Sequence, residues 1–163
     1  MINHKIYARH CGVNVCDRLQ IALIKRCIRI ALDLEGVDVP CEVSVLITDD
    51  SGIRGLNNEF RGIDRPTDVL SFPIQVFPAQ GWENPGADAV EADTGTIPLG
   101  DVVFSAQRVR AQCLESGREI SAETAYLTVH SVLHLLGYDH TDESEGKRLM
   151  RAREKEIMSE MRC

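Results

Sequence analysis

The chain has 163 residues, 44% of them hydrophobic and 26% charged, which suits one globular domain and excludes a disordered or fibrous chain. Its formal net charge is −7, from 18 basic and 25 acidic residues, so it does not coat nucleic acid by bulk charge. The N-terminal stretch MINHKIYARH lacks the apolar run of a signal peptide, and no apolar stretch is long enough to span a membrane. We therefore expect a soluble, cytoplasmic protein that does not associate with a membrane.

The N-terminal part of the chain predicts a strand, a helix and a second strand. The first strand is short and lies at 5–8. Apolar residues recur with a helical period over 16–34, and Gly36 is placed to end that helix. The stretch CEVSVLIT, 41–48, alternates apolar and polar residues and is rich in β-branched side chains, which is typical of a strand.

A short helix and an edge strand are expected next. Residues 49–51 offer several side chains that can cap a helix, which should then run to about residue 60. The stretch 67–74 has the composition of a strand, and Pro73 places its end at the edge of a sheet. Residues 77–98 are rich in Pro, Gly and acidic side chains, and this loop is too long to be a plain connection.

The C-terminal part predicts one more strand and three helices. The strand lies at 99–105, and Ser105 can cap a helix that runs to about residue 115. Further helices are expected over 121–136 and 142–161. The order of elements predicts a single α+β domain over the whole chain, with a small mixed sheet of about four strands and packed helices.

The six cysteines require a choice between disulfides, metal binding and simple burial. They are Cys11, Cys16, Cys27, Cys41, Cys113 and Cys163. None forms a CxxC pair, and without an export signal a disulfide framework is not expected. We interpret them as reduced and mostly buried small hydrophobic residues, with a metal-binding pair of Cys11 and Cys16 as the alternative.

Basic residues are unevenly distributed. The stretch 66–107 has no Lys or Arg but six acidic residues. Basic side chains gather instead in three clusters: Lys25, Arg26 and Arg29; Arg54, Arg61 and Arg65; and those from Lys147 to Lys155. Such clusters are either solvated helix faces or a locally positive groove on an acidic protein, and for the first and third clusters both interpretations stay open.

Three of the five histidines lie in HSVLHLLGYDH, 130–140. On a helix His130 and His134 share one face, so both can bind one metal ion. Gly137 can end the helix in a left-handed conformation, and the chain can then return with His140 as a third ligand. Three imidazoles bind a tetrahedral ion and leave its fourth position open, which is a catalytic rather than a structural arrangement. Zinc is the default metal for three nitrogens, although nickel or copper would also bind.

The same histidine spacing occurs in the metzincin proteases, HExxHxxGxxH, where the residue after the first histidine is a glutamate general base. Here that residue is Ser131. A serine cannot accept a proton in that role at neutral pH. The pattern therefore argues against peptide hydrolysis, although a bound zinc can still activate water or polarise a phosphoryl oxygen.

The stretch LNNEFRGIDRPTDVLSFP, 56–73, is the second informative segment. Arg61 and Arg65 flank a turn that contains a glycine, and a guanidinium suits bidentate contacts with phosphate. An arginine beside an open metal site stabilises the charge of a phosphoryl-transfer transition state. By itself the pattern also fits a surface ion pair, which is the commoner fate of an arginine in a turn.

Three segments together resemble one known family. HSVLHLLGYDH resembles the signature HGxLHLxGYDH of the YbeY family, and 56–73 resembles its motif LNxxYRGxDxPTDVLSFP. LGDVVFS, 99–105, is similar to the LGDIxIS-like strand of that family. The segments occur in the family's order, and the resemblance covers nearly the whole chain. It implies a zinc-dependent, single-strand-specific endoribonuclease that matures the 3′ end of 16S rRNA and acts in ribosome quality control.

The resemblance also implies roles for particular residues. His130, His134 and His140 would bind one zinc ion, and Arg61 would be the catalytic arginine. The implied partners are single-stranded RNA and the small ribosomal subunit with its precursors. The chain departs from the family at Ser131, where the signature has glycine, which adds a hydroxyl and a Cβ beside the first ligand.

Further expectations concern access to the site. The acidic segment 77–98 is longer than a minimal connection and could form a lid or a partner contact. Phe60, Phe72 and Tyr138 could stack on RNA bases, although Phe72 is more typical of a core residue.

Two other functions compete with the nuclease. One is a zinc hydrolase of peptides or amides, which the missing glutamate opposes. The other is a non-catalytic, zinc-containing ribosome-assembly factor, which the open fourth metal position opposes. Within the nuclease hypothesis, the attacking group is either water or the neighbouring 2′-hydroxyl.

Overall fold

The computed structural model describes residues 1–139 and 145–161. Its strands and helices are β1 (Lys5–His10), α1 (Ile21–Leu34), β2 (Cys41–Thr48), α2 (Asp50–Arg61), β3 (Val69–Pro73), β4 (Ile97–Ser105), α3 (Ala106–Ser116), α4 (Ile120–Leu135) and α5 (Glu145–Glu160). Two 3-10 turns, η1 (Val15–Asp17) and η2 (Ala87–Ala89), lie in the connections. The predicted α+β fold with a four-stranded mixed sheet is confirmed for these residues.

The sheet has the strand order β1-β2-β4-β3. β1, β2 and β4 run parallel, whereas β3 is antiparallel to β4, with Leu70 paired to Val103. β3 is therefore an edge strand, as Pro73 at its end predicts. Within the described part of the chain, none of the helices is long and apolar enough to cross a membrane.

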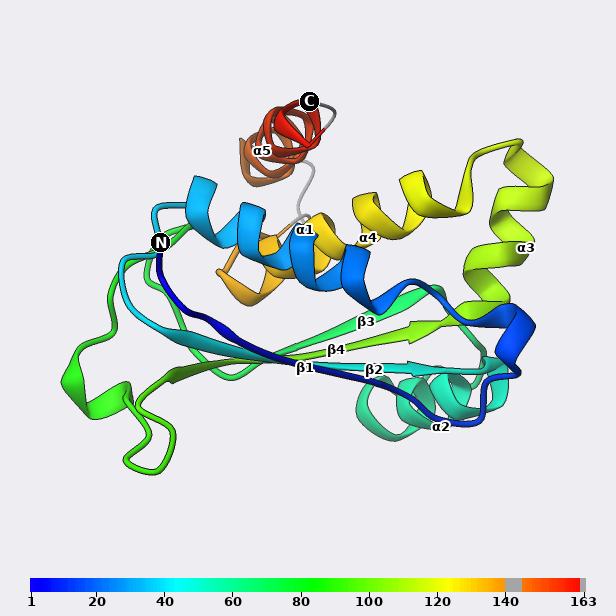
Figure 1. Ribbon diagram of the computed structural model, residues 1–163, viewed down its shortest axis with the longest axis horizontal. Helices are drawn as coiled ribbons and strands as arrows, with labels where there is room; N and C mark the ends of the chain where they lie inside the picture. Colours follow the sequence, from blue (N-terminus) through cyan, green and yellow to red (C-terminus); the bar gives the residue numbers. More distant parts are fainter. Residues whose placement is uncertain (140–144, 162–163) are drawn as a thin grey trace.

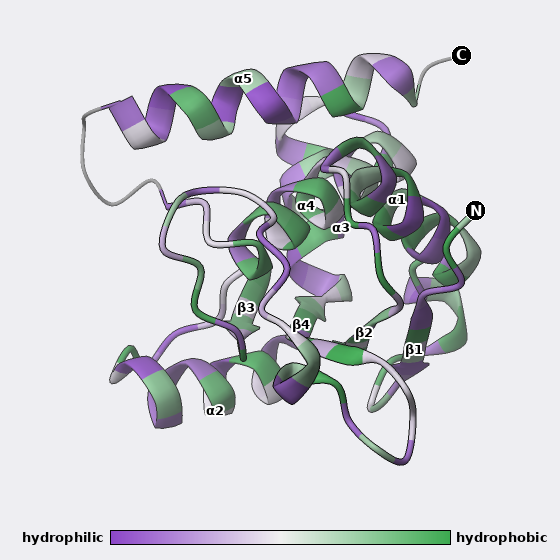
Figure 2. Cartoon of the chain, turned by 90° about the vertical axis from the view of Figure 1, so that its left-hand side faces the viewer, coloured by the Kyte–Doolittle hydropathy of each residue, from purple (hydrophilic) through white to green (hydrophobic). Residues whose placement is uncertain are grey.

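Helices cover the two faces of the sheet unequally. Figure 1 shows α1 and α4 on one face, α2 on the other and α3 at one end of the sheet. In Figure 2, α5 lies across the outside of the layer formed by α1 and α4. Residues 41, 43, 45 and 47 of β2 are buried in the larger core with α1 and α4, whereas Leu46 faces the smaller core with Ile53 of α2. This alternation is the period-two pattern that the sequence of β2 predicts.

The first helix begins later than predicted: α1 starts at Ile21, whereas the predicted range was 16–34. The guanidinium of Arg110 donates hydrogen bonds to the carbonyl oxygens of Asp17 and Arg18, at 2.9 and 3.1 Å. An extended helix would need those two carbonyl groups for its own first turns. A side chain from α3 binds them instead, so the preceding residues form only the turn η1.

The acidic segment is shorter than predicted and is attached to the body of the protein. β4 begins at Ile97, two residues before the predicted strand. The amide of Gly81 donates to the carbonyl of Leu136 at 3.1 Å, and the Trp82 indole donates to Asp38 at 2.9 Å. The segment is thereby fixed against the C-terminal end of α4.

The cysteines divide into two groups. No disulfide is present among the five described ones, as predicted, and Cys27, Cys41 and Cys113 are buried. Burial raises the pKa of the Cys27 thiol to about 11 and that of Cys41 to about 12, so both stay protonated. The prediction of burial is wrong for Cys11 and Cys16, which are exposed. Cys163 lies outside the described residues.

Candidate active site

Two of the three predicted metal ligands face each other on α4. The Nε2 atoms of His130 and His134 are 3.1 Å apart, as expected for side chains one helical turn apart. Gly137 has a φ of +88°, and a Cβ at this position would lie 3.1 Å from the Cβ of Phe77. Both facts favour glycine where the chain turns away from α4. His140, the third predicted ligand, lies outside the described residues.

The hydrogen bonds of the two imidazoles fit a bound cation. His130 Nδ1 lies 2.6 Å from Glu154 Oε1, and His134 Nδ1 lies 2.9 Å from the carbonyl oxygen of Tyr138. Both partners are acceptors, so each Nδ1 carries the proton and each Nε2 presents a lone pair when the ring is neutral. Two nitrogens bound to one tetrahedral zinc ion lie about 3.3 Å apart. The observed separation, and the tautomers that the two acceptors favour, therefore suit shared metal binding.

Glu154 is a site residue that sequence reasoning missed. Its side chain is buried, and its second oxygen accepts a hydrogen bond from the Tyr126 hydroxyl at 3.3 Å. A carboxylate that binds the outer nitrogen of a ligand histidine fixes the ring's orientation and tautomer. The sequence carried one signal for it, namely its helical spacing from apolar residues. Met150, Glu154 and Ile157 together form the buried stripe of α5. A carboxylate within such a stripe requires a polar partner.

A second contact ties α5 to the turn after α4. Arg153 donates to Glu35 Oε1 at 2.7 Å, and the Tyr138 hydroxyl donates to Glu35 Oε2 at 2.8 Å. Burial, followed by the hydrogen bond to Glu35, raises the pKa of Tyr138 to about 12. The phenol therefore remains a neutral donor at physiological pH. These contacts join α1, α5 and the turn next to the histidines.

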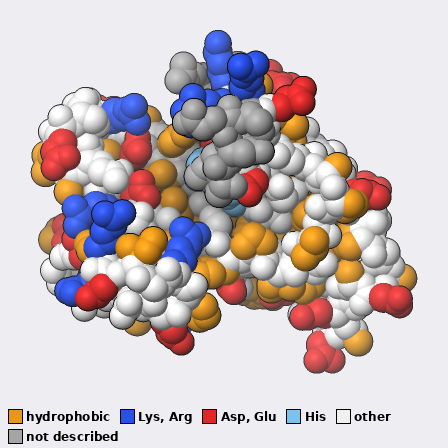
Figure 3. All heavy atoms as spheres, turned by 180° about the vertical axis from the view of Figure 1, so that it is seen from behind, with side chains coloured by type: hydrophobic (Ala, Val, Ile, Leu, Met, Phe, Trp, Pro, Cys, Tyr) orange, Lys and Arg blue, Asp and Glu red, His pale blue; other side chains and the backbone are white. Residues whose placement is uncertain are grey.

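The histidines open into a cleft of about 820 Å³. Its walls are α4, β3 with the segment that follows it to Phe77, and the side chain of Arg61. Arg61 is the last residue of α2, because Gly62 takes a φ of +68° and ends the helix. The carboxylates Asp68 and Asp139 also line the cleft. Figure 3 shows histidine atoms near the centre of this face, with Lys and Arg side chains above them and at the lower left.

The three arginines of the middle basic cluster have different environments. Arg61 lines the cleft, whereas Arg54 forms an exposed ion pair with Asp64 at 2.8 Å. The backbone carbonyl of Arg65 accepts a hydrogen bond from the buried Asn57 side chain at 2.9 Å. Asn57 and the Arg54–Asp64 pair fix the turn that follows Arg61. The structure thus brings Arg61 into the same cleft as the histidines.

Of the three predicted stacking residues, only Tyr138 lines the cleft. Phe60 and Phe72 pack against each other, with ring centroids 5.2 Å apart, and line a separate groove on the α2 face of the sheet. Tyr138 borders the cleft but is buried, and its hydroxyl is hydrogen-bonded. Tyr126 and Phe77 line the cleft and are only partly buried. Phe60 and Phe72 thus lie on the α2 face of the sheet and not in the cleft, and the packing of Phe72 against the smaller core agrees with its interpretation as a core residue.

Ser131 does not take part in the cleft. It is fully buried beside His130, and its Oγ has no hydrogen-bond partner within the described ranges. A residue at this helical position points into the core between α4 and its neighbours. No base therefore occupies the place of the metzincin glutamate.

Comparisons with known proteins agree with this geometry. The family model described as "Endoribonuclease YbeY" matches residues 9–162. A Clostridium kluyveri protein named Endoribonuclease YbeY is 42% identical over 151 residues, which are 90% of this chain and 91% of the relative. A protein of the same name from Clostridium botulinum strain Eklund 17B is 46% identical, covering 83% of this chain and 84% of the relative.

A solved structure has a similar fold. The solution structure of TM1509 from Thermotoga maritima aligns with a TM-score of 0.57 and 25% identity, covering 94% of this chain and 87% of that one. The α+β architecture and the extent of the sequence matches agree. The chain belongs to the YbeY endoribonuclease family.

Proposed function

We propose that this protein is a zinc-dependent, single-strand-specific endoribonuclease of the cytoplasm. Its substrate in this proposal is the 3′ end of 16S rRNA in precursors of the small ribosomal subunit, where it also serves ribosome quality control. The observation that carries the proposal is that paired imidazole nitrogens and Arg61 share one cleft in a member of an endoribonuclease family.

In this proposal His130, His134 and His140 bind the zinc ion. When bound, zinc lowers the pKa of a coordinated water to about 7 or polarises a phosphate oxygen. Glu154 and the carbonyl of Tyr138 keep the two described imidazoles in the tautomer that binds metal.

Arg61 provides positive charge opposite the histidines. Attack on the phosphodiester by water or by the neighbouring 2′-hydroxyl places additional negative charge on the phosphate oxygens. A guanidinium stabilises that charge through two parallel hydrogen bonds. Its side chain forms no ion pair with another described residue, so it is available to a phosphate.

The cleft also supports a preference for single strands. Tyr126 and Phe77 offer aromatic surface at its walls, and the exposed side chain of Val76 lies beside them. Bases can stack on such surfaces only when they are not paired within a duplex. The peptide-hydrolase alternative gains no support, because buried Ser131 stands where a protease would have its base.

Removal of zinc tests the proposed activity. We expect a chelator to stop cleavage of a single-stranded ribosomal RNA fragment and added zinc to restore it, while a duplex of the same sequence stays intact. Cleavage can be followed on denaturing gels with a labelled 3′ fragment of 16S rRNA. Cleavage that persists in chelator would contradict the zinc-dependent mechanism. A zinc-loaded protein that never cuts RNA would favour a ribosome-assembly factor.

Replacing Glu154 with glutamine is expected to weaken zinc binding by about 10–100-fold. The amide oxygen can still accept a hydrogen bond from His130 Nδ1, but the negative charge of the carboxylate is lost. The zinc dissociation constant can be measured by competition with a chromophoric chelator. Glu156→Gln is the matched control, since Glu156 is exposed on the same helix and pairs with Arg153. Equal dissociation constants in the two variants would show that Glu154 has no role in metal binding.

A further inference from the structure

A second groove lies beside the cleft, between α4 and α5. It has a volume of about 710 Å³, and its walls include Arg118, Arg151 and Lys155. Tyr126 lines both the cleft and this groove, so the two hollows meet at its ring. The rings of Tyr126 and His130 are 6.0 Å apart between centroids. A polymer that leaves the histidines past Tyr126 therefore enters the groove directly.

The two acidic side chains of the groove are barely exposed and already have partners within the protein. Glu123 forms an ion pair with Arg118 at 3.0 Å, and its side chain is 9% exposed. Glu154 is 8% exposed and binds His130 and Tyr126. Both carboxylates are therefore nearly buried and already hold hydrogen-bond donors of the protein. Arg151 and Lys155 are therefore the exposed charges of the groove wall that have no counter-ion among the described residues.

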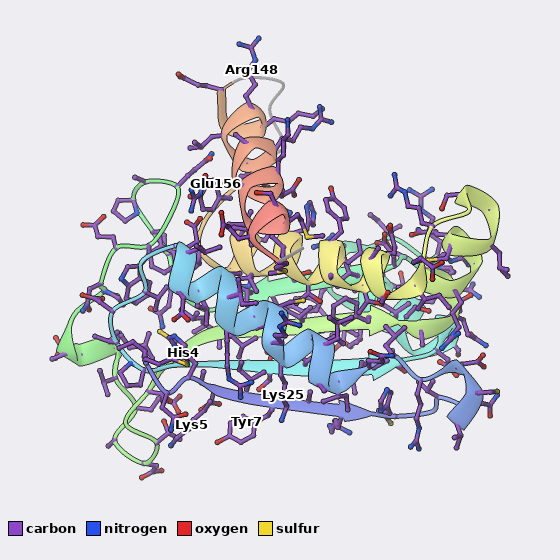
Figure 4. The ribbon with its side chains drawn as sticks, turned by 45° about the horizontal axis from the view of Figure 1, so that its top comes forward. His4, Lys5, Tyr7, Lys25, Arg148 and Glu156 are labelled. Atoms are coloured by element: carbon purple, nitrogen blue, oxygen red, sulfur yellow. The ribbon has the colours of Figure 1, made fainter. Side chains whose placement is uncertain are left out.

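The two flanks of α5 differ in how their charges are used. On the flank toward α1, Arg153 pairs with both Glu35 and Glu156. On the flank toward α4, Arg151 and Lys155 are exposed and form no ion pair with any other described residue. They are four residues apart and so lie about 6 Å apart along the helix. Figure 4 shows Arg148, at the start of α5, pointing away from the molecule, so it does not extend this pair.

We propose that Arg151 and Lys155 bind the phosphate backbone of the RNA strand outside the cleavage site, along the groove between α4 and α5. This inference rests on the proposed nuclease function. Unpaired cations, nearly buried carboxylates and an aromatic ring at the junction favour a phosphate polymer over an acidic protein segment. The groove also explains how a chain with a net charge of −7 can bind RNA, since two local cations attract the strand next to the site.

The test compares a long and a short RNA substrate. The double variant R151Q/K155Q is expected to lose about 10-fold in kcat/KM on a single strand of about 20 nucleotides, which reaches into the groove. The same variant should cleave a strand of about 5 nucleotides, which occupies the cleft alone, as fast as the wild type. For the long strand, the slope of log kcat/KM against log salt concentration should become shallower by about 1.4, because two phosphate contacts are lost.

The matched control is K25Q/R29Q. These residues are also four apart on a helix, and neither lines the cleft or the groove. Figure 4 shows Lys25 on α1 next to β1, at the opposite edge of the sheet from β3. The control removes the same charge, so a loss shared by both double variants would reflect bulk charge and overturn the proposal.

The remaining outcomes are separable. If the wild type cleaves neither strand, the proposed nuclease function itself fails. If R151Q/K155Q cleaves both strands as the wild type does, the groove does not bind RNA and the inference is overturned.

Discussion

Replacing His134 with alanine is expected to abolish zinc-dependent RNA cleavage and leave the protein folded. The variant removes one of the two facing Nε2 atoms and therefore a proposed metal ligand. Loss of a hydrogen-bond partner of a metal ligand typically lowers metal affinity or activity by about 10–100-fold, and we expect loss of the ligand itself to lower activity further. Alanine is the best helix former, so α4 should persist. The lost hydrogen bond to the Tyr138 carbonyl costs only about 1 kcal/mol of stability.

The measurement compares wild type and His134→Ala, purified identically, on the same single-stranded ribosomal RNA fragment with zinc present. Zinc content and the thermal unfolding midpoint are measured on the same preparations. His10→Ala is the control, because His10 lies on β1, does not line the cleft, and its imidazole contacts the backbone carbonyl oxygen of Leu19. Equal cleavage by wild type and His134→Ala would trace the activity to a contaminating ribonuclease.

Arg61→Ala is expected to lower kcat by about 100–1,000-fold while zinc binding stays unchanged. The loss should be confined to catalysis, because Arg61 lines the cleft without forming a hydrogen bond to either described histidine. The side chain is exposed at the end of α2, so its removal should not unfold the protein. Single-turnover cleavage and zinc content measure the two effects separately.

Two variants make the Arg61 experiment specific. Arg29→Ala removes the same charge from the exposed face of α1 and should retain wild-type activity. Arg61→Lys preserves the charge but loses the planar guanidinium, so an intermediate rate is expected if bidentate phosphate binding matters. Wild-type activity in Arg61→Ala would defeat the assignment of Arg61 as the catalytic arginine.

The elements with strong local signals were predicted correctly. β2 has the predicted range of 41–48, because its alternating β-branched residues need no tertiary information. Asp49 and Ser105 cap their helices as expected, since a capping side chain bonds an amide only three residues away. The start of α1 was misplaced because Arg110, distant in the sequence, binds carbonyl groups that a longer helix would use.

The sequence by itself determined the paired histidines, because helical periodicity places residues four apart on one face and Gly137 ends that helix. Only the tertiary structure decided which other groups join them. Glu154 reaches His130 from 24 residues away because α5 packs across α4, and Arg61 enters the cleft because α2 ends beside the edge strand β3. Contacts between separate elements depend on how the faces of those elements pack together. The spacing of residues along the chain therefore does not reveal which of them meet.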